Sequence, residues 1–114
     1  CASCHGPDGR GGGPSAEERN PVTGEMEPVK DDWGNPIIIR DLTRGLFRFG
    51  RRPIDLYRRI YAGINGTPMP SHSAMKAPGT NDRMLSDEDL WDIVHYVRSL
   101  SSHGQTVVTL EDAR

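Results

Sequence analysis

Two cysteines and a histidine open the chain in the spacing Cys1-x-x-Cys4-His5, and the sequence holds only these two cysteines. On a helix the two thiols lie one turn apart, so both can add across the two vinyl groups of a haem. The histidine then lies under the iron as its proximal axial ligand. The motif therefore predicts a covalently attached haem c, one per chain, with iron bound by His5.

A haem that carries electrons without binding a substrate needs a second axial ligand, and a methionine sulfur raises its potential. Met69 lies in the run Gly-Thr-Pro-Met-Pro at residues 66–70, where two prolines stiffen the backbone. The chain between His5 and Met69 is long enough to wrap around a haem and return to its far face. We therefore predict Met69 as the second iron ligand, with ordinary loop packing as the alternative.

Other side chains are rivals for this position. Met75 comes next, because the chain after Pro70 could loop back, and His72 is the main histidine alternative because it lies close to Met69. His95 falls opposite much of the apolar stripe of the last expected helix, which favours a surface position. The weaker candidates are Met26, Met84 and His103.

Composition adds two constraints. Only 34% of the residues are hydrophobic, which is low for a small fold that must bury its own core, and a haem would supply apolar surface. Residues 40–60 carry seven arginines and two aspartates between acidic segments. They could steer an acidic partner or hold haem propionates, although a solvated helix face explains most of them. The acidic flanks argue against nucleic-acid binding. No stretch has the apolar length of a membrane span.

Helical patterns are clearest in two segments. Residues 53–62 begin with a proline suited to a first helical turn, and Gly63 can end that helix in a left-handed cap. The run Ser-Asp-Glu-Asp at 86–89 resembles a capping box and begins a final helix that reaches about Leu100. Residues 1–6 are predicted as the last turn of a helix.

Turn-forming glycines and prolines occupy most of the remaining chain. We expect an open loop at 9–14, one helical turn at 15–19, a long surface loop or small hairpin at 20–36, extended chain at 37–39 and a helical turn at 44–47. One domain is expected over residues 1–100, followed by a C-terminal tail at 101–114.

These motifs together resemble the mono-haem class I cytochromes c, closest to the domains that serve bacterial respiratory complexes and haem-copper oxidases. The resemblance rests on the haem motif, on Asp-Leu-Thr at 41–43, on the methionine motif at 63–70 and on the helix at 90–97. It covers residues 1 to about 100. It implies a small all-α fold of about three to four helices around one covalent haem, with histidine below the iron and methionine above.

The resemblance also implies neighbours for the haem. The free ring N–H of His5 needs an acceptor, and the family suggests a proline-linked carbonyl before Asp41, for which Pro36 is the candidate. The side chains expected to line the haem pocket are Tyr57, Ile60 and Ile64, although core packing explains each of them equally well. The expected propionate donors are Arg40, which comes first, Arg44 and Trp33.

Two features depart from the family. Its N-terminal helix begins before the haem motif and crosses the C-terminal helix, so we expect this helix to be truncated and the chain to be a fragment of a longer precursor or subunit. Residues 15–36 look longer than in a minimal member and are taken as decoration rather than a partner-specific loop. Because haem is attached on the outer face of the energy-transducing membrane, we expect a periplasmic location or that face, with any anchor upstream of Cys1.

Three functions compete. The first is one-electron transfer, without catalysis, between respiratory redox partners or subunits of a larger complex. The second is a haem enzyme or gas sensor with a displaceable Met69, but Pro68 and Pro70 argue against a mobile ligand, and His72 is the only obvious distal group. The third has no haem: a redox dithiol lacks a βαβ pattern, zinc lacks a fourth ligand, and a disulfide leaves the methionine motif unexplained. We expect the first.

Overall fold

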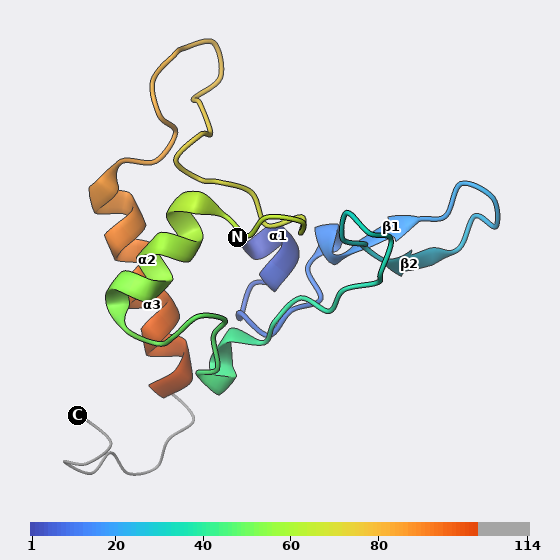
Figure 1. The fold of residues 1–114 in the computed structure, drawn as a ribbon, viewed down its shortest axis with the longest axis horizontal. Coiled ribbons are helices and arrows are strands. Elements are labelled where there is room, and N and C mark those ends of the chain that lie inside the picture. Colours follow the sequence, from blue (N-terminus) through green and yellow to red (C-terminus); the bar gives the residue numbers. More distant parts are fainter. Residues whose placement is uncertain (103–114) are drawn as a thin grey trace.

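The computed structural model describes residues 1–102, in which three α-helices and two 3-10 turns accompany one two-stranded sheet. The helices are α1 (Ala2–His5), α2 (Pro53–Ala62) and α3 (Asp87–Ser102), the 3-10 turns are η1 (Pro14–Ala16) and η2 (Leu42–Arg44), and the strands are β1 (Glu17–Arg19) and β2 (Met26–Pro28). The helices α2 and α3 lie together, while the β1–β2 hairpin projects away from them (Figure 1). The regular secondary structure is thus mainly helical, as expected, with paired strands confined to the hairpin within residues 1–102.

Local sequence sets both ends of α2. Pro53 occupies its first turn, and the Asp55 carboxylate accepts hydrogen bonds from the Arg52 backbone N–H (3.2 Å) and guanidinium (2.8 and 2.9 Å). This contact lowers the pKa of Asp55. Gly63 ends the helix with φ 71° and ψ −171°, which is not the left-handed cap expected. Glycine is needed there because a Cβ would lie 2.7 Å from the carbonyl carbon of Pro70.

The capping box predicted for the last helix is present at the start of α3. The Asp89 backbone N–H donates to the Ser86 hydroxyl at 3.1 Å, and the Ser86 N–H donates to the Asp89 carboxylate at 2.9 Å. Two of the donors that a helix start leaves free are thereby satisfied. The helix continues to Ser102, slightly beyond the expected end at Leu100.

The apolar core lies between α2 and α3. Leu56 and Ile60 of α2 pack with Leu90 and Val94 of α3, and the last two are fully buried. Partly buried side chains that surround this cluster are Phe47, Tyr57, Met69, Leu85, Trp91, Ile93 and Val97. Among residues 1–52, by contrast, Ala16 is the only buried apolar residue.

A small hairpin was one of the two forms predicted for residues 20–36, and the hairpin found begins earlier, with β1 at Glu17–Arg19 and β2 at Met26–Pro28. The helical turn expected at 15–19 is wrong beyond Ala16, because β1 pairs antiparallel with β2. The Asn20 side-chain oxygen accepts from the backbone N–H groups of Val22 (2.8 Å) and Thr23 (3.1 Å). This Asx turn reverses the chain, so that the residues before it are extended rather than helical.

Two short segments follow the hairpin. Residues 37–39 are extended and belong to no strand, as predicted. The helical turn expected at 44–47 lies earlier, at η2, because the Asp41 carboxylate accepts from the Thr43 N–H at 2.9 Å and Gly45 ends the turn in the left-handed region.

Within residues 1–102, no helix combines the length and apolarity needed to cross a membrane. Ser101 and Ser102 of the predicted tail belong to α3. The rest of the tail, including His103, lies outside the described residues.

Candidate haem site

The first element of the site is the single helical turn α1, which carries the cysteine pair. The His5 backbone N–H donates to the Cys1 carbonyl at 2.8 Å, which sets the two cysteines one turn apart. Both thiols are free, with Cys1 exposed and Cys4 half-buried. This is the arrangement in which two thiols can add to one porphyrin edge.

The glycine-rich loop after α1 folds back onto it through backbone contacts. The Gly11 N–H donates to the His5 carbonyl at 2.7 Å, and the Gly13 N–H donates to the Cys4 carbonyl at 3.0 Å. Gly11 has φ 94°, and a Cβ there would lie 2.9 Å from the Ile39 carbonyl oxygen. Only glycine accommodates both the positive φ and the close approach. The loop therefore joins α1 to the extended segment 37–39.

The His5 ring is oriented by a backbone carbonyl, as predicted, but Pro36 is the wrong residue. His5 Nδ1 lies 3.1 Å from the Arg40 carbonyl oxygen. Pro36 is exposed and forms an isolated bridge with Lys30 instead. The Leu42 N–H donates to the Gly9 carbonyl at 2.7 Å, which draws the chain around residue 40 to α1.

This contact determines the tautomer of His5. A carbonyl oxygen has no proton to donate, so Nδ1 carries the hydrogen and Nε2 keeps its lone pair for a metal. Burial lowers the pKa of His5, and the hydrogen bond to Arg40 partly opposes that change. The neutral, oriented imidazole is the form that binds iron.

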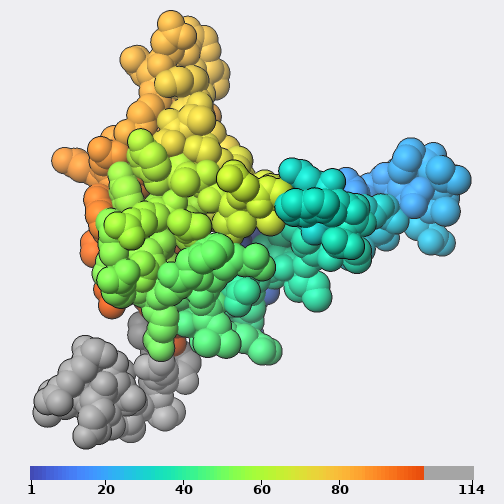
Figure 2. Space-filling model, viewed as in Figure 1, coloured from blue at the N-terminus to red at the C-terminus, as the bar shows by residue number. Residues whose placement is uncertain are grey.

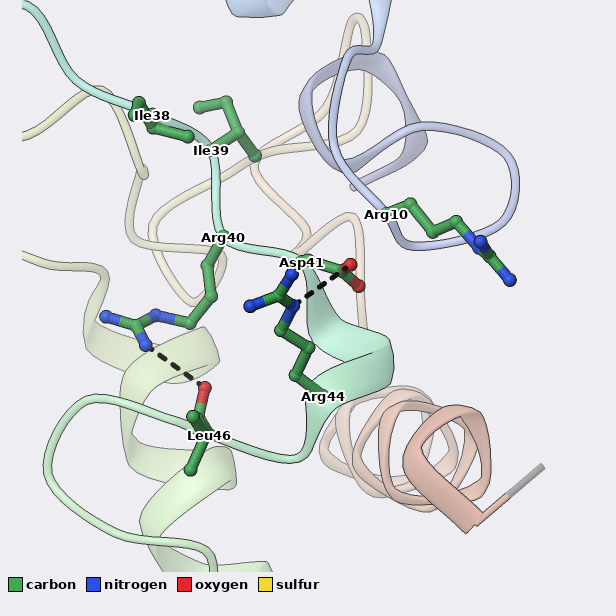
Figure 3. A pocket seen from close by; sticks show the side chains of 7 residues that line it. All are labelled: Arg10, Ile38, Ile39, Arg40, Asp41, Arg44 and Leu46. Atoms are coloured by element: carbon green, nitrogen blue, oxygen red, sulfur yellow. Dashed lines mark hydrogen bonds and ion pairs between the residues drawn. The ribbon is translucent and has the colours of Figure 1, made fainter. Parts of the chain in front are cut away.

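Arg40, whose carbonyl contacts His5, also lines a cavity of about 440 Å³, which Figure 3 shows from close by. The isoleucines of the extended segment lie at one end and Leu46 lies at the other, and Ile38 and Leu46 are 94% and 61% exposed. Arg40 donates to the Leu46 carbonyl at 3.3 Å, and Arg44 lies 3.8 Å from the Asp41 carboxylate. The lining combines exposed apolar side chains with guanidinium groups, which suit the carboxylate edge of a porphyrin, and it does not include Cys1, Cys4, His5 or Met69.

Two of the seven residues that line this cavity, Arg40 and Arg44, were predicted as site residues. The other five are Arg10, Ile38, Ile39, Asp41 and Leu46. The position of Arg10, in the glycine-rich loop directly after the haem motif, could have identified it. Neither Ile38 nor Leu46 stands in a motif, so their role depends on the path of the backbone.

Met69 lies in a loop closed by its own hydrogen bonds. The Thr67 hydroxyl donates to the Ile64 carbonyl at 2.8 Å and accepts from the Met69 N–H at 3.3 Å. The Ile64 N–H donates to the Met69 carbonyl at 3.3 Å. Met69 is half-buried and packs against the α2–α3 core. Its role as axial ligand stays a prediction.

The rivals of Met69 have different surroundings. His72 is buried, and its Nδ1 lies 3.1 Å from the Ile60 carbonyl, the same kind of contact that His5 makes, so its Nε2 is also free for a metal and His72 stays an alternative ligand. Met75 is half-buried, and His95 is exposed on α3 as expected. The exposed methionines are Met26 and Met84.

The residues predicted to line the haem pocket all have partners of their own. The Tyr57 ring stacks on Trp91 at 4.5 Å between centroids, and its hydroxyl donates to Asp87 at 3.0 Å. Ile60 belongs to the α2–α3 core, and Ile64 is half-buried in the Met69 loop. Packing accounts for these positions, and contact with haem stays a prediction.

Trp33, the third expected propionate donor, is 77% exposed, and its ring packs against the loop that carries Met69. Its indole ring contacts Gly66, and it does not line the cavity that Arg40 and Arg44 share. The three expected donors are therefore divided between two parts of the site.

Comparison with known families agrees with this geometry. The family model Cytochrome c matches residues 1–101, and the chain belongs to the cytochrome c family. Membership implies covalent haem c, which the free thiols of α1 and the oriented His5 fit.

A solved structure is also similar, the "reducing HAO-like protein complex" of Kuenenia stuttgartiensis. The alignment has a TM-score of 0.65 and 41% sequence identity, and it covers 88% of this chain and 37% of that chain. This chain thus spans little more than a third of the chain that it matches. Among curated proteins, no relative matched.

Proposed function

We propose that the chain is an electron carrier that passes single electrons through one low-spin haem, with His5 and Met69 as axial ligands. The observation that carries this proposal is the hydrogen bond from His5 Nδ1 to the Arg40 carbonyl at 3.1 Å. It leaves Nε2 free for iron, on the same turn as two free cysteines. Membership in the cytochrome c family supports the same role.

Each part of the site has a defined task. Bound haem supplies a ferric–ferrous couple that changes by one electron. Cys1 and Cys4 would hold its edge, and the Arg40 carbonyl keeps the His5 ring in one orientation. The guanidinium groups of Arg40 and Arg44 offer charge-assisted hydrogen bonds to its carboxylates. The closed loop around Met69 would restrain the sulfur.

We also propose that the chain works with other redox proteins, as a subunit or domain of a larger assembly. The similar Kuenenia structure is a protein complex, and this chain covers 37% of the chain that it matches. We place this assembly in the periplasm or on the outer face of the energy-transducing membrane, because haem attachment occurs there. The donor and acceptor would be other redox centres of that assembly.

Spectra of the purified haem-loaded protein test the proposal. In alkaline pyridine the denatured protein should give c-type haem bands, because two thioethers replace the vinyl groups. The ferric protein should show the methionine-to-iron charge-transfer band. Met69→Ala should lose this band, and the matched variant Met75→Ala should keep it. Absence of c-type bands would refute the haem, and retention of the band in Met69→Ala would refute the ligand assignment.

A further inference from the structure

The segment 15–36, defined here as the insert, is tied to α1 at its start. The Gly13 N–H donates to the Cys4 carbonyl at 3.0 Å, and the Ala16 N–H donates to the Gly13 carbonyl at 2.9 Å. The second half of the insert joins this ladder, because the Val29 N–H donates to the Ala16 carbonyl at 3.1 Å. The base of the insert is therefore positioned by the backbone of the cysteine motif.

The C-terminal end of the insert, residues 31–35, is a compact turn that the Asp31 carboxylate stabilises. Its carboxylate oxygen Oδ1 accepts from the backbone N–H groups of Trp33 (3.0 Å) and Asn35 (2.9 Å). The Asp31 N–H donates to the Asn35 carbonyl at 2.9 Å, which closes the turn. These three bonds hold the backbone of Trp33 in one place, independently of what its side chain touches.

The turn 31–35 contacts the loop that carries Met69. The Asp32 N–H donates to the Gly66 carbonyl at 2.9 Å. A Cβ on Gly66 would lie 2.5 Å from Cζ3 and 2.7 Å from Cη2 of Trp33, so the indole ring covers the bare backbone of that glycine. The contact between the insert and this loop is visible from outside in Figure 2. The insert thus connects the cysteine motif to the Met69 loop.

We propose that the turn 31–35 braces the Met69 loop, with Trp33 as a positioning residue that restrains the loss of Met69 from iron. This inference rests on the proposed function, in which Met69 is the axial ligand. Gly66 lies inside the closed segment from Ile64 to Met69, in which the Thr67 hydroxyl donates to the Ile64 carbonyl and accepts from the Met69 N–H. For the sulfur to leave the iron this loop must move, and the Trp33 ring with the Asp32 N–H opposes that movement. In this proposal the insert supports the site, in place of the decoration predicted from the sequence.

Imidazole binding to the ferric protein tests the brace, because imidazole must displace the methionine. We expect Trp33→Ala to raise the apparent imidazole affinity about fivefold, which corresponds to about 1 kcal/mol. Trp33→Phe should restore most of the wild-type value, since a flat ring remains over Gly66. Asp31→Ala should also raise the apparent imidazole affinity, because it removes the carboxylate that holds the turn 31–35 while the Trp33 ring stays in the chain.

Val22→Ala is the matched control, since Val22 lies in the same insert and is 90% exposed. It should bind imidazole as the wild type does. If Trp33→Ala and Asp31→Ala bind as the wild type does while Met69→Ala binds more tightly, the brace is refuted and the ligand assignment stands. If Met69→Ala itself binds as the wild type does, the ligand assignment fails and the brace with it. A fivefold rise in Trp33→Ala that Trp33→Phe reverses supports the brace.

Discussion

The helix pair α2–α3 and the loop-rich segment from α1 to η2 are held together by different forces. The helix pair has an apolar core, in which Leu90 and Val94 are fully buried. Residues 1–44 are joined mainly by backbone hydrogen bonds, such as Gly11 N–H to the His5 carbonyl, by close approaches at glycines, and by the bond from the His5 ring to the Arg40 carbonyl. Burial of apolar area stabilises the first region, whereas the second depends on backbones that can approach one another.

This difference has a practical meaning for the site. Because the loop-rich segment is held mainly by backbone groups, its two thiols, which form no disulfide, and the Nε2 of His5 stay available for a bound group. The helix pair gives rigidity, and the Met69 loop packs against it. The helix pair should therefore be weakened by removing a side chain, and the loop-rich segment by adding one.

The largest loss of stability is expected for Leu90→Ala. Truncation of a fully buried leucine removes apolar burial and leaves a cavity, which costs about 2–5 kcal/mol in comparable cores. Denaturant unfolding of the haem-loaded protein measures this loss. Val22→Ala is the exposed control and should change the free energy of unfolding by less than about 0.5 kcal/mol. An equal effect of the two truncations would contradict the helix-pair core.

Gly11→Ala tests the loop-rich segment by the opposite change. The added methyl group would lie 2.9 Å from the Ile39 carbonyl oxygen, at a residue with φ 94°. Strain of this kind costs about 1–3 kcal/mol. The neighbouring Gly12→Ala is the matched control, because Gly12 also has positive φ (73°) but nothing lies within 4 Å of its Cβ position. A loss no greater in Gly11→Ala than in Gly12→Ala would show that the close approach is unimportant.

A smaller loss is expected where the helix pair depends on a hydrogen bond. Ser86→Ala removes the hydroxyl that accepts from the Asp89 N–H at 3.1 Å. Loss of such an N-cap costs about 1 kcal/mol, and Ser86→Thr should retain most of the stability because it keeps the hydroxyl. Thermal unfolding of the two variants beside the wild type measures the difference. Equal melting temperatures for Ala and Thr would exclude the cap.

The smallest effect is expected for the ion pair at the start of α2, whose contribution to stability depends on pH. The Arg52 guanidinium lowers the pKa of Asp55 below its ordinary value of 3.8, so this pair stabilises the folded chain above that pH. The contribution disappears as the pH falls through the lowered folded-state value. Asp55→Asn should therefore melt below the wild type at pH 7, and the gap should narrow below pH 3.8. A gap that stays constant with pH would refute the ion pair.

Features marked by residue type were predictable. The boundaries of α2 follow from Pro53 and Gly63, the start of α3 follows from its capping box, and α1 follows from the cysteine motif. Proline, glycine and capping residues act within one turn of themselves, so a local pattern carries their information. The error at Glu17–Arg19 arose because strand pairing depends on where β2 lies.

The sequence by itself determined the class of the protein, since a Cys-x-x-Cys-His motif and a Pro-Met-Pro segment are chemical patterns that need no coordinates. Tertiary structure alone decided that Arg40, and not Pro36, orients His5, and that Trp33 lies on the Met69 loop. Every residue has a backbone carbonyl, so residue type does not identify the carbonyl that accepts from His5. The chain also has several aromatic residues, so residue type does not identify the ring that contacts the Met69 loop. The path of the backbone decides which of these groups come within contact distance.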